Sequence, residues 1–293
     1  MAAVPGAQCA EISRTLDEPM VGTAPSTRRW LCLEWPEAWP ADINHSREPA
    51  VRALLARAAT AGFRPLMIRS TERGPERRSP RIFLTDTAPG RTVTTMLPIE
   101  RLERLDDLPL PEPDHPLPGD PVTRPLFLVC AHEQRDPCCG LAGSALLDAI
   151  AGPDVFAASH LGGHRFAPTA LILPTGYVYG RLEPASATAI RLGAADREVT
   201  TDRCRGRCTW SPRGQVAELA VREATGLRSP DALIVEDDDS GDTVQVHTAT
   251  GDRWAVDVEA VVVDATRPAS CGARPTLIVP LRATAVRELR PGR

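Results

Sequence analysis

Residues 126–150 read LFLVCAHEQRDPCCGLAGSALLDAI, and this stretch decides which fold the sequence predicts. Its first five residues are apolar and predict a short buried strand that ends at Cys130. Residues 140–150 carry apolar side chains at helical spacing, so they predict a helix. Cys130 therefore lies at the end of a strand and Cys139 just ahead of a helix, with eight residues between the two.

The segments that follow extend this strand–helix unit. Residues 155–159 (VFAAS) predict a second strand that runs into His160, and residues 169–174 and 177–182 predict a hairpin. A further helix is expected over 184–194. The order strand–helix–strand–strand–strand–helix is close to that of a thioredoxin-like sandwich, so we predict the α/β class.

A smaller α/β unit is predicted ahead of this one. RRWLCLEW at 28–35 is apolar and predicts a strand, and residues 47–61 predict a helix with Pro49 in its first turn. Three more short strands are expected within 63–98. The sequence contains no internal repeat of a clear period, although two α/β halves are possible.

The chain divides by composition. Seven prolines between residues 107 and 125 exclude a helix or a central strand there and indicate an extended linker. Towards the C-terminus the residues alternate in strand fashion, for example in TVQVHT and WAVDVEAVVV. We therefore predict four parts: an N-terminal α/β domain (1–106), the proline-rich linker (107–125), a thioredoxin-like domain (126–228) and a β-rich C-terminal extension (229–293).

Composition also limits the partners that we expect. The net charge is −4 and all 34 basic residues are Arg, so the chain lacks the basic excess of a general nucleic-acid-binding protein. No apolar stretch is long enough to span a membrane, and the N-terminus does not resemble a secretion signal. We therefore expect a cytoplasmic protein whose eight cysteines stay reduced, with the clustered ones serving as metal ligands or redox thiols.

Four soft donors lie within 35 residues: Cys130, Cys139, His160 and His164. Two thiolates and two imidazoles can bind a tetrahedral metal ion or complete the two irons of a [2Fe–2S] cluster. Gly162-Gly163 disfavours a helix between the histidines and predicts a tight loop that turns both rings inward. Zinc is the alternative metal, although structural zinc sites commonly have shorter Cys–Cys spacings than this C-x8-C pair.

The other thiols and imidazoles give weaker predictions. A thiol oxidoreductase that uses Cys138/Cys139 or the C-x3-C pair Cys204/Cys208 is a further hypothesis. Cys138 is also an alternative to Cys139 as the second thiolate ligand. Three cysteines are isolated in the sequence and are expected to be structural: Cys9, Cys32 and Cys271. Four histidines are expected to face solvent: His45, His115, His132 and His247; His132 is also close enough to the ligand loop to support the ligands.

At these residues the chain resembles the sucrase/ferredoxin-like family, whose members include thioredoxin-like ferredoxins. The matching stretches are CAHEQRDPCCG at 130–140 and SHLGGHRFAPTALILPTGYVYGRL at 159–182, supported by EPMVGTA at 18–24, RWLCLEWPEAW at 29–39 and RGRC at 205–208. The resemblance implies a [2Fe–2S] cluster bound by Cys130, Cys139, His160 and His164. It also implies a role for Arg135 and Asp136 in ordering the ligand loop.

A protein of this kind is expected to transfer electrons or sense redox state rather than act as a stand-alone enzyme. Imidazole ligands raise the reduction potential above that of an all-thiolate cluster, and a ring N–H can couple electron uptake to proton uptake. We therefore expect a potential that falls as the pH rises in the alkaline range. The expected partner is a redox protein. The sequence does not identify this partner, the oligomeric state or the task of the N-terminal domain.

Overall fold

The computed structural model describes residues 8–72, 80–99, 102–236 and 241–289. Its first half contains four strands around one crossover helix: β1 (Arg29–Glu34), α2 (Pro49–Thr60), β2 (Phe63–Ser70), β3 (Arg81–Asp86) and β4 (Val93–Pro98). Strand β1 pairs in parallel with β2 and antiparallel with β3, and β3 pairs antiparallel with β4. A short 3-10 turn, η1 (Ile43–His45), lies between β1 and α2, and a second, η2 (Leu102–Leu105), follows β4.

The second half repeats the arrangement. It consists of β6 (Leu126–Cys130), α3 (Pro137–Ile150), β7 (Val155–Ala158), β8 (Ala170–Leu173) and β9 (Tyr177–Tyr179), followed by α4 (Pro184–Ala195) and β10 (Cys204–Arg207). Strand β6 pairs in parallel with β7 and antiparallel with β8, and β8 pairs antiparallel with β9. The expected thioredoxin-like strand order is present. The first half has the same order, although the sequence contains no clear repeat.

One ten-stranded sheet joins the two halves, in the order β10-β9-β8-β6-β7-β2-β1-β3-β4-β5. The junction is antiparallel pairing between β2 and β7, with Arg69 opposite Ala157. Strand β5 (Asp120–Pro121), which lies in the predicted linker, pairs with β4 at the outer edge. The predicted boundaries at residues 106 and 125 stay a prediction, but the strands on either side of them share a sheet.

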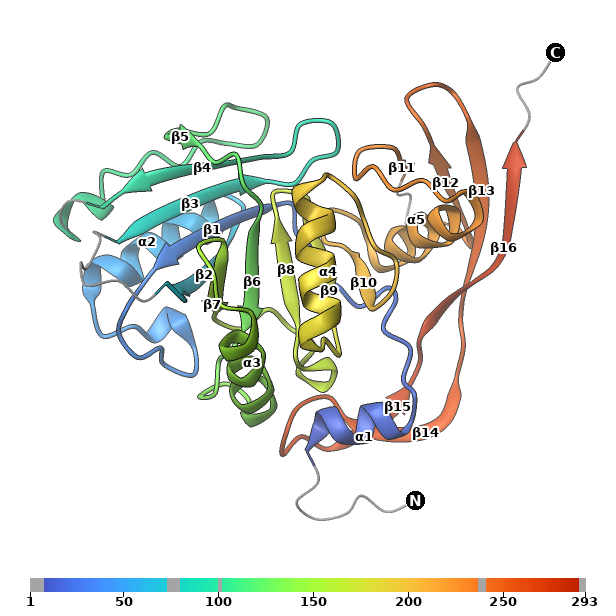
Figure 1. Cartoon of the computed structure of the whole chain (residues 1–293), viewed down its shortest axis with the longest axis horizontal. Coiled ribbons are helices and arrows are strands. Elements are labelled where there is room, and N and C mark those ends of the chain that lie inside the picture. The colour runs from blue at the N-terminus through green and yellow to red at the C-terminus, as the bar shows by residue number, and fades with distance from the viewer. Residues whose placement is uncertain (1–7, 73–79, 100–101, 237–240, 290–293) are drawn as a thin grey trace.

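The sheet curls, and its helices lie outside the curl (Figure 1). The Trp30 indole N–H on β1 donates to the Cys208 sulfur, which follows β10, at 3.3 Å, although five strands separate β1 and β10 within the sheet order. Phe83 and Phe156, one from each half, meet edge to face at 5.7 Å between ring centroids. The concave face thus closes on a shared apolar core, while α2 covers the outer face of one half and α3 and α4 that of the other.

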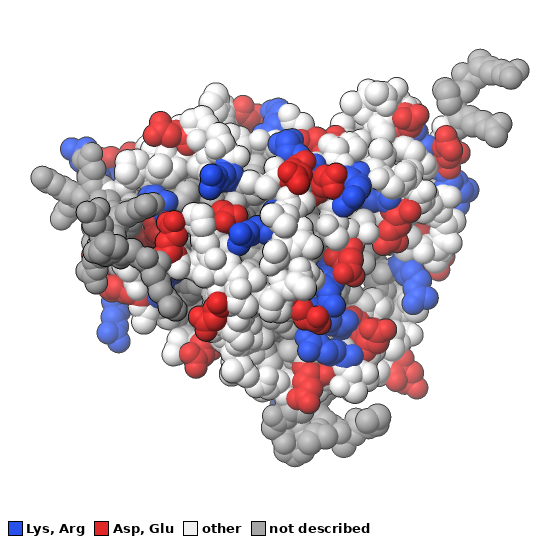
Figure 2. Space-filling view, viewed as in Figure 1, with Lys and Arg blue, Asp and Glu red and all other residues white. Residues whose placement is uncertain are grey.

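The C-terminal part adds two smaller sheets, so the predicted α/β class with a β-rich extension is confirmed. Helix α5 (Pro212–Thr225) packs on a four-stranded sheet of β11 (Ile234–Glu236), β12 (Thr243–His247), β13 (Arg253–Ala260) and β16 (Leu281–Leu289). The hairpin of β14 (Val263–Pro268) and β15 (Pro275–Ile278) returns to lie beside α1 (Cys9–Thr15), beneath the end of α3 in Figure 1. On the face that Figure 2 shows, acidic and basic side chains are interspersed rather than separated by sign.

Candidate metal centre

Parallel pairing of β6 with β7 brings the first ligand candidates to one edge of the sheet. Cys130 is the last residue of β6 and lies opposite Ala158, the last residue of β7. Since the carboxyl ends of parallel strands meet at the same edge, the loop that continues from Ala158 to His160 passes beside Cys130. The Cys130 thiol is buried, with 1% of the residue exposed.

Cys139 reaches the same place from the start of α3. The helix begins at Pro137 rather than at the predicted residue 140, because the Asp136 carboxylate caps it by accepting the Cys138 backbone N–H at 2.9 Å. Both cysteines of the Cys138-Cys139 pair therefore lie in the first helical turn, where free backbone amides and the helix dipole favour thiolates. Asp136 thus orders the ligand loop, as expected, by capping the helix. Arg135, for which the same role was expected, is exposed.

The two histidines lie side by side in the loop after β7. Their rings stack, with 4.2 Å between centroids and 11° between planes. The Cys139 sulfur lies 3.7 Å from Nδ1 of His164. Gly162 and Gly163 adopt φ values of 93° and 76°, which only glycine takes without strain, so the predicted tight loop is present and the 3-10 turn η3 (His164–Phe166) begins directly after it.

The charges of these groups depend on one another. The Cys139 thiol donates to the Cys130 sulfur, which lowers the pKa of Cys130 well below its ordinary value and raises the pKa of Cys139. His160 and the Leu161 backbone also lower the pKa of Cys130. Burial, together with His160, lowers the pKa of His164 to about 4. These contacts favour the thiolate form of Cys130 and the neutral form of the His164 ring.

The donor set fits a soft metal or a [2Fe–2S] cluster. Within the described residues, Nδ1 of His160 is buried and has no hydrogen-bond partner. A buried polar atom without a partner costs free energy that a bound metal would recover. Two thiols and two imidazoles converge here without a competing Lys or a disulfide among the described residues.

Arg205 holds the histidine loop in place, a role that the sequence did not predict. Its guanidinium donates to the Gly162 carbonyl at 2.9 Å and to the Thr23 hydroxyl at 3.1 Å, and it also donates to the Thr23 carbonyl. A Cβ on Gly163 would lie 2.4 Å from this guanidinium, so the arginine and the glycine fit only together. The stretches EPMVGTA and RGRC carried the signal, because their residues meet at this loop.

Cys138 faces away from this centre, towards helix α1 and the turn between β14 and β15. Its sulfur lies 3.6 Å from that of Cys9 and 3.3 Å from that of Cys271. The expectation that Cys9 and Cys271 are isolated is therefore wrong, because the C-terminal hairpin folds back against α1. Separation along the sequence hid a contact that only the tertiary fold creates.

Cys204 and Cys208 lie apart in the fold although they are close in sequence. Cys204 packs in the core beneath α3 and α4, and Cys208 packs in the concave core with Trp30. Burial raises the pKa of Cys204 to about 12 and also raises that of Cys208. Cys32 is buried in the concave core with Cys208, which agrees with its expected structural role.

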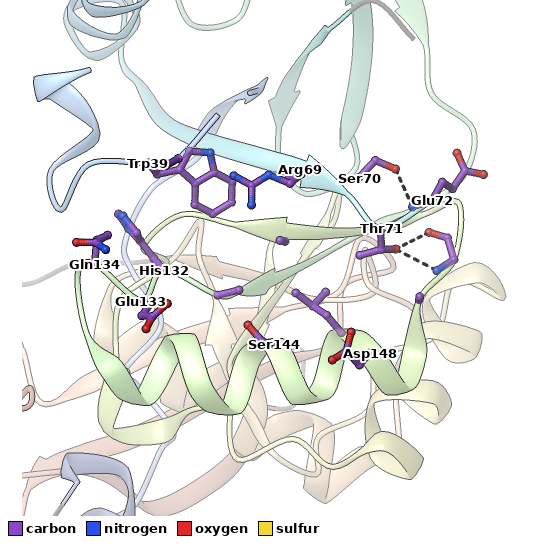
Figure 3. Close-up of a pocket in the computed structure, with 16 residues that line it drawn as sticks. Trp39, Arg69, Ser70, Thr71, Glu72, His132, Glu133, Gln134, Ser144 and Asp148 are labelled. Atoms are coloured by element: carbon purple, nitrogen blue, oxygen red, sulfur yellow. Dashed lines mark hydrogen bonds between the residues drawn. The ribbon is translucent and has the colours of Figure 1, made fainter. Parts of the chain in front are cut away.

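An open pocket of about 780 Å³ lies on the other side of the ligand loop, over the junction of β2 and β7 (Figure 3). Trp39 and Arg69 line it from the first half of the chain, and Ser144 and Asp148 of α3 line it from the second. His132, expected to face solvent, is 2% exposed and its Nε2 lies 2.9 Å from the Pro40 carbonyl. The ligand loop is thus fastened to the first half of the chain.

The fold and the site together define an α/β protein with a buried Cys/His group of the kind that can hold a metal ion. The sucrase/ferredoxin-like family model matches residues 20–206, and the chain belongs to this family. Altered inheritance of mitochondria protein 32 from Eremothecium gossypii is 38% identical over 73 residues, which are 23% of this chain and 21% of that protein. No solved structure matches the chain. Among the described residues, the helices are too short or too polar to cross a membrane.

Proposed function

We propose that this protein transfers electrons or senses redox state by means of a [2Fe–2S] cluster bound by Cys130, Cys139, His160 and His164. The observation that carries the proposal is the convergence of two buried thiols and two stacked imidazoles at one edge of a thioredoxin-like sheet. Membership in a family whose description includes ferredoxins supports the choice of cluster.

When bound, such a cluster supplies a site for one electron, and the protein's own residues set its environment. Cys130 and Cys139 bind as thiolates, while His160 and His164 bind as neutral rings, so the oxidised site carries little net charge. The His164 side chain is 11% exposed, so its ring can exchange a proton with solvent when the charge of the site changes. Arg205 and the two loop glycines keep both rings turned towards the thiols.

A single zinc ion without a redox role is the second candidate, and one spacing is compatible with it. Metal–sulfur bonds of about 2.3 Å and metal–nitrogen bonds of about 2.0 Å at a tetrahedral centre separate the two donors by about 3.5 Å. The Cys139 sulfur and Nδ1 of His164 are 3.7 Å apart, close to that value. A zinc-stabilised interaction module would have this geometry.

Metal analysis combined with electron paramagnetic resonance (EPR) on anaerobically purified protein tests the proposal. We expect about two irons per chain, a red-brown colour and a paramagnetic signal after one-electron reduction. His164→Ala should lower the iron content, while His164→Cys should keep iron and shift the signal. Cys204→Ala, which removes a buried thiol elsewhere in the sheet, is the matched control and should keep both.

Two outcomes would refute the cluster. Colourless protein with about one zinc ion per chain at these residues would favour the interaction module. Thiol–disulfide exchange activity that survives His160→Ala and His164→Ala but is lost with Cys138 or Cys139 would favour a thiol oxidoreductase.

We further propose that the cytoplasm is the working compartment and that the partner is a redox protein. The ligand roles of Cys130 and Cys139 require reduced thiols, which agrees with a reducing compartment. Localisation of a tagged full chain checks this, and co-purification under reducing conditions identifies the partner.

A further inference from the structure

A second group of metal-ligating side chains lies next to the candidate cluster site, on the opposite side of the Cys138-Cys139 pair. It consists of Cys9, Cys138, Cys271 and Asp136. Cys9 begins helix α1, Cys138 lies in the first turn of α3, and Cys271 lies in the turn between β14 and β15. These three elements come together beneath α3 in Figure 1, although up to 262 residues separate the cysteines in sequence.

The three sulfurs form a nearly equilateral triangle. The distances are 3.6 Å from Cys9 to Cys138, 3.3 Å from Cys138 to Cys271 and 3.7 Å from Cys271 to Cys9. Thiolates around one tetrahedral ion with metal–sulfur bonds of about 2.3 Å lie about 3.8 Å apart. Thiolates that bind different irons of a cluster lie farther apart, so this spacing favours a mononuclear ion.

Asp136 occupies the fourth side of the group. Its carboxylate oxygens accept the backbone N–H groups of Cys138 and Cys271, each at 2.9 Å, and lie 3.9 and 4.0 Å from the Cys9 sulfur. Asp136 is 1% exposed, and Cys9 and Cys138 are 0% and 1% exposed. A buried carboxylate beside three thiols concentrates negative charge, and such groups are normally neutralised by a cation or a metal.

A disulfide explains the arrangement less well. It would join two of the sulfurs at about 2.05 Å and leave the third thiol unused. A tetrahedral ion uses all four groups. Zn²⁺ is the ion that prefers such a closed, thiolate-rich tetrahedral site, and it has no redox chemistry of its own.

We propose that Cys9, Cys138, Cys271 and Asp136 bind one structural Zn²⁺ ion. The ion fastens α1 and the C-terminal hairpin to the first turn of α3, which also carries Cys139. The adjacent cysteines of the pair then serve two different centres, Cys138 the zinc ion and Cys139 the cluster site. The zinc site does not depend on the identity of the metal group at Cys130 and the two histidines.

Elemental analysis of the full-length protein, expressed with zinc supplied, tests the proposal. We expect about one zinc ion per chain in the wild type. Cys9→Ser and Cys271→Ser should each lower zinc at least about tenfold while the iron content and the reduced EPR signal stay at wild-type values. Cys32→Ser, which alters a buried thiol of the concave core, is the matched control and should leave both metals unchanged.

Measurements on the wild type keep the test decisive if a serine variant fails to fold. Less than about a tenth of a zinc ion per chain, or a mass two hydrogens lower that reveals a disulfide, would overturn the proposal. Zinc that persists in both serine variants would also overturn the proposal. Zinc that disappears in a folded His160→Ala His164→Ala double variant would assign the ion to the first site instead, whereas loss of iron alone there would support two separate sites.

Discussion

Replacing Gly143 by alanine should destabilise the protein, although the same change stabilises most helices. Alanine in place of glycine inside a helix normally gains about 0.5–1 kcal/mol, because it restricts the unfolded chain. Gly143 lies on the face of α3 that contacts β6. A Cβ there would lie 2.0 Å from the Cys130 carbonyl oxygen and 3.1 Å from the Ala131 Cα, which are backbone atoms that cannot rotate away.

The required movement gives the size of the effect. Real Cβ atoms essentially never approach closer than 3.0 Å, so α3 must move about 1 Å away from β6. Overpacking of this kind costs about 1–3 kcal/mol, which outweighs the propensity gain. Because Cys139 lies one turn before Gly143 and Cys130 lies on β6, the movement separates the two thiolates by more than the roughly 0.5 Å that a preorganised site tolerates.

The assay compares two variants. Gly193→Ala is the matched control, because this helical glycine of α4 has 3.6 Å of clearance around an added Cβ. We expect Gly193→Ala to raise the free energy of unfolding in a denaturant titration by about 0.5–1 kcal/mol and to keep the bound metal. Gly143→Ala should lower that free energy and lose metal. A Gly143→Ala protein as stable as Gly193→Ala, with wild-type metal content, would refute the reasoning.

Three further predictions concern stability. Burial raises the pKa of Glu18, but the hydrogen bonds and charges of Arg267 and a second arginine outweigh it and lower the pKa below the ordinary value of 4.5. The charged form of Glu18 therefore stabilises the folded protein above this pH, and the stabilisation is lost as the pH falls below it. In thermal melts, the melting temperature of the wild type should fall more steeply with acid than that of Glu18→Gln. Arg222 and Glu218 form a fully buried ion pair at 3.0 Å, so Arg222→Met should cost about 3–5 kcal/mol in denaturant titrations and the Arg222→Met Glu218→Gln double variant should cost less. Gly226 ends α5 at a φ of 73°, so Gly226→Ala should cost about 1 kcal/mol in the same titrations although the space around it is open.

Local sequence patterns determined the elements of the second half and the candidate donors. Apolar runs and turn residues located β6, β7 and the β8–β9 hairpin, because strand burial leaves a direct record in residue type. The residues of the Cys130 site could also be predicted from the sequence. The parallel pairing of β6 and β7 brings the two loops that carry these residues to the same edge of the sheet. The start of α3 was placed three residues late, because the cap by Asp136 depends on a side-chain hydrogen bond rather than on hydrophobic periodicity.

Tertiary structure alone decided which distant residues meet. The two halves share one strand order, yet their sequences contain no clear repeat, because a strand order fixes where chains run and only loosely which apolar residues fill the core. Cys204 and Cys208 are near neighbours in sequence but belong to opposite faces of the sheet. Cys9 and Cys271 are 262 residues apart and meet at Cys138, because the β14–β15 hairpin folds back against α1 through contacts that no local pattern encodes.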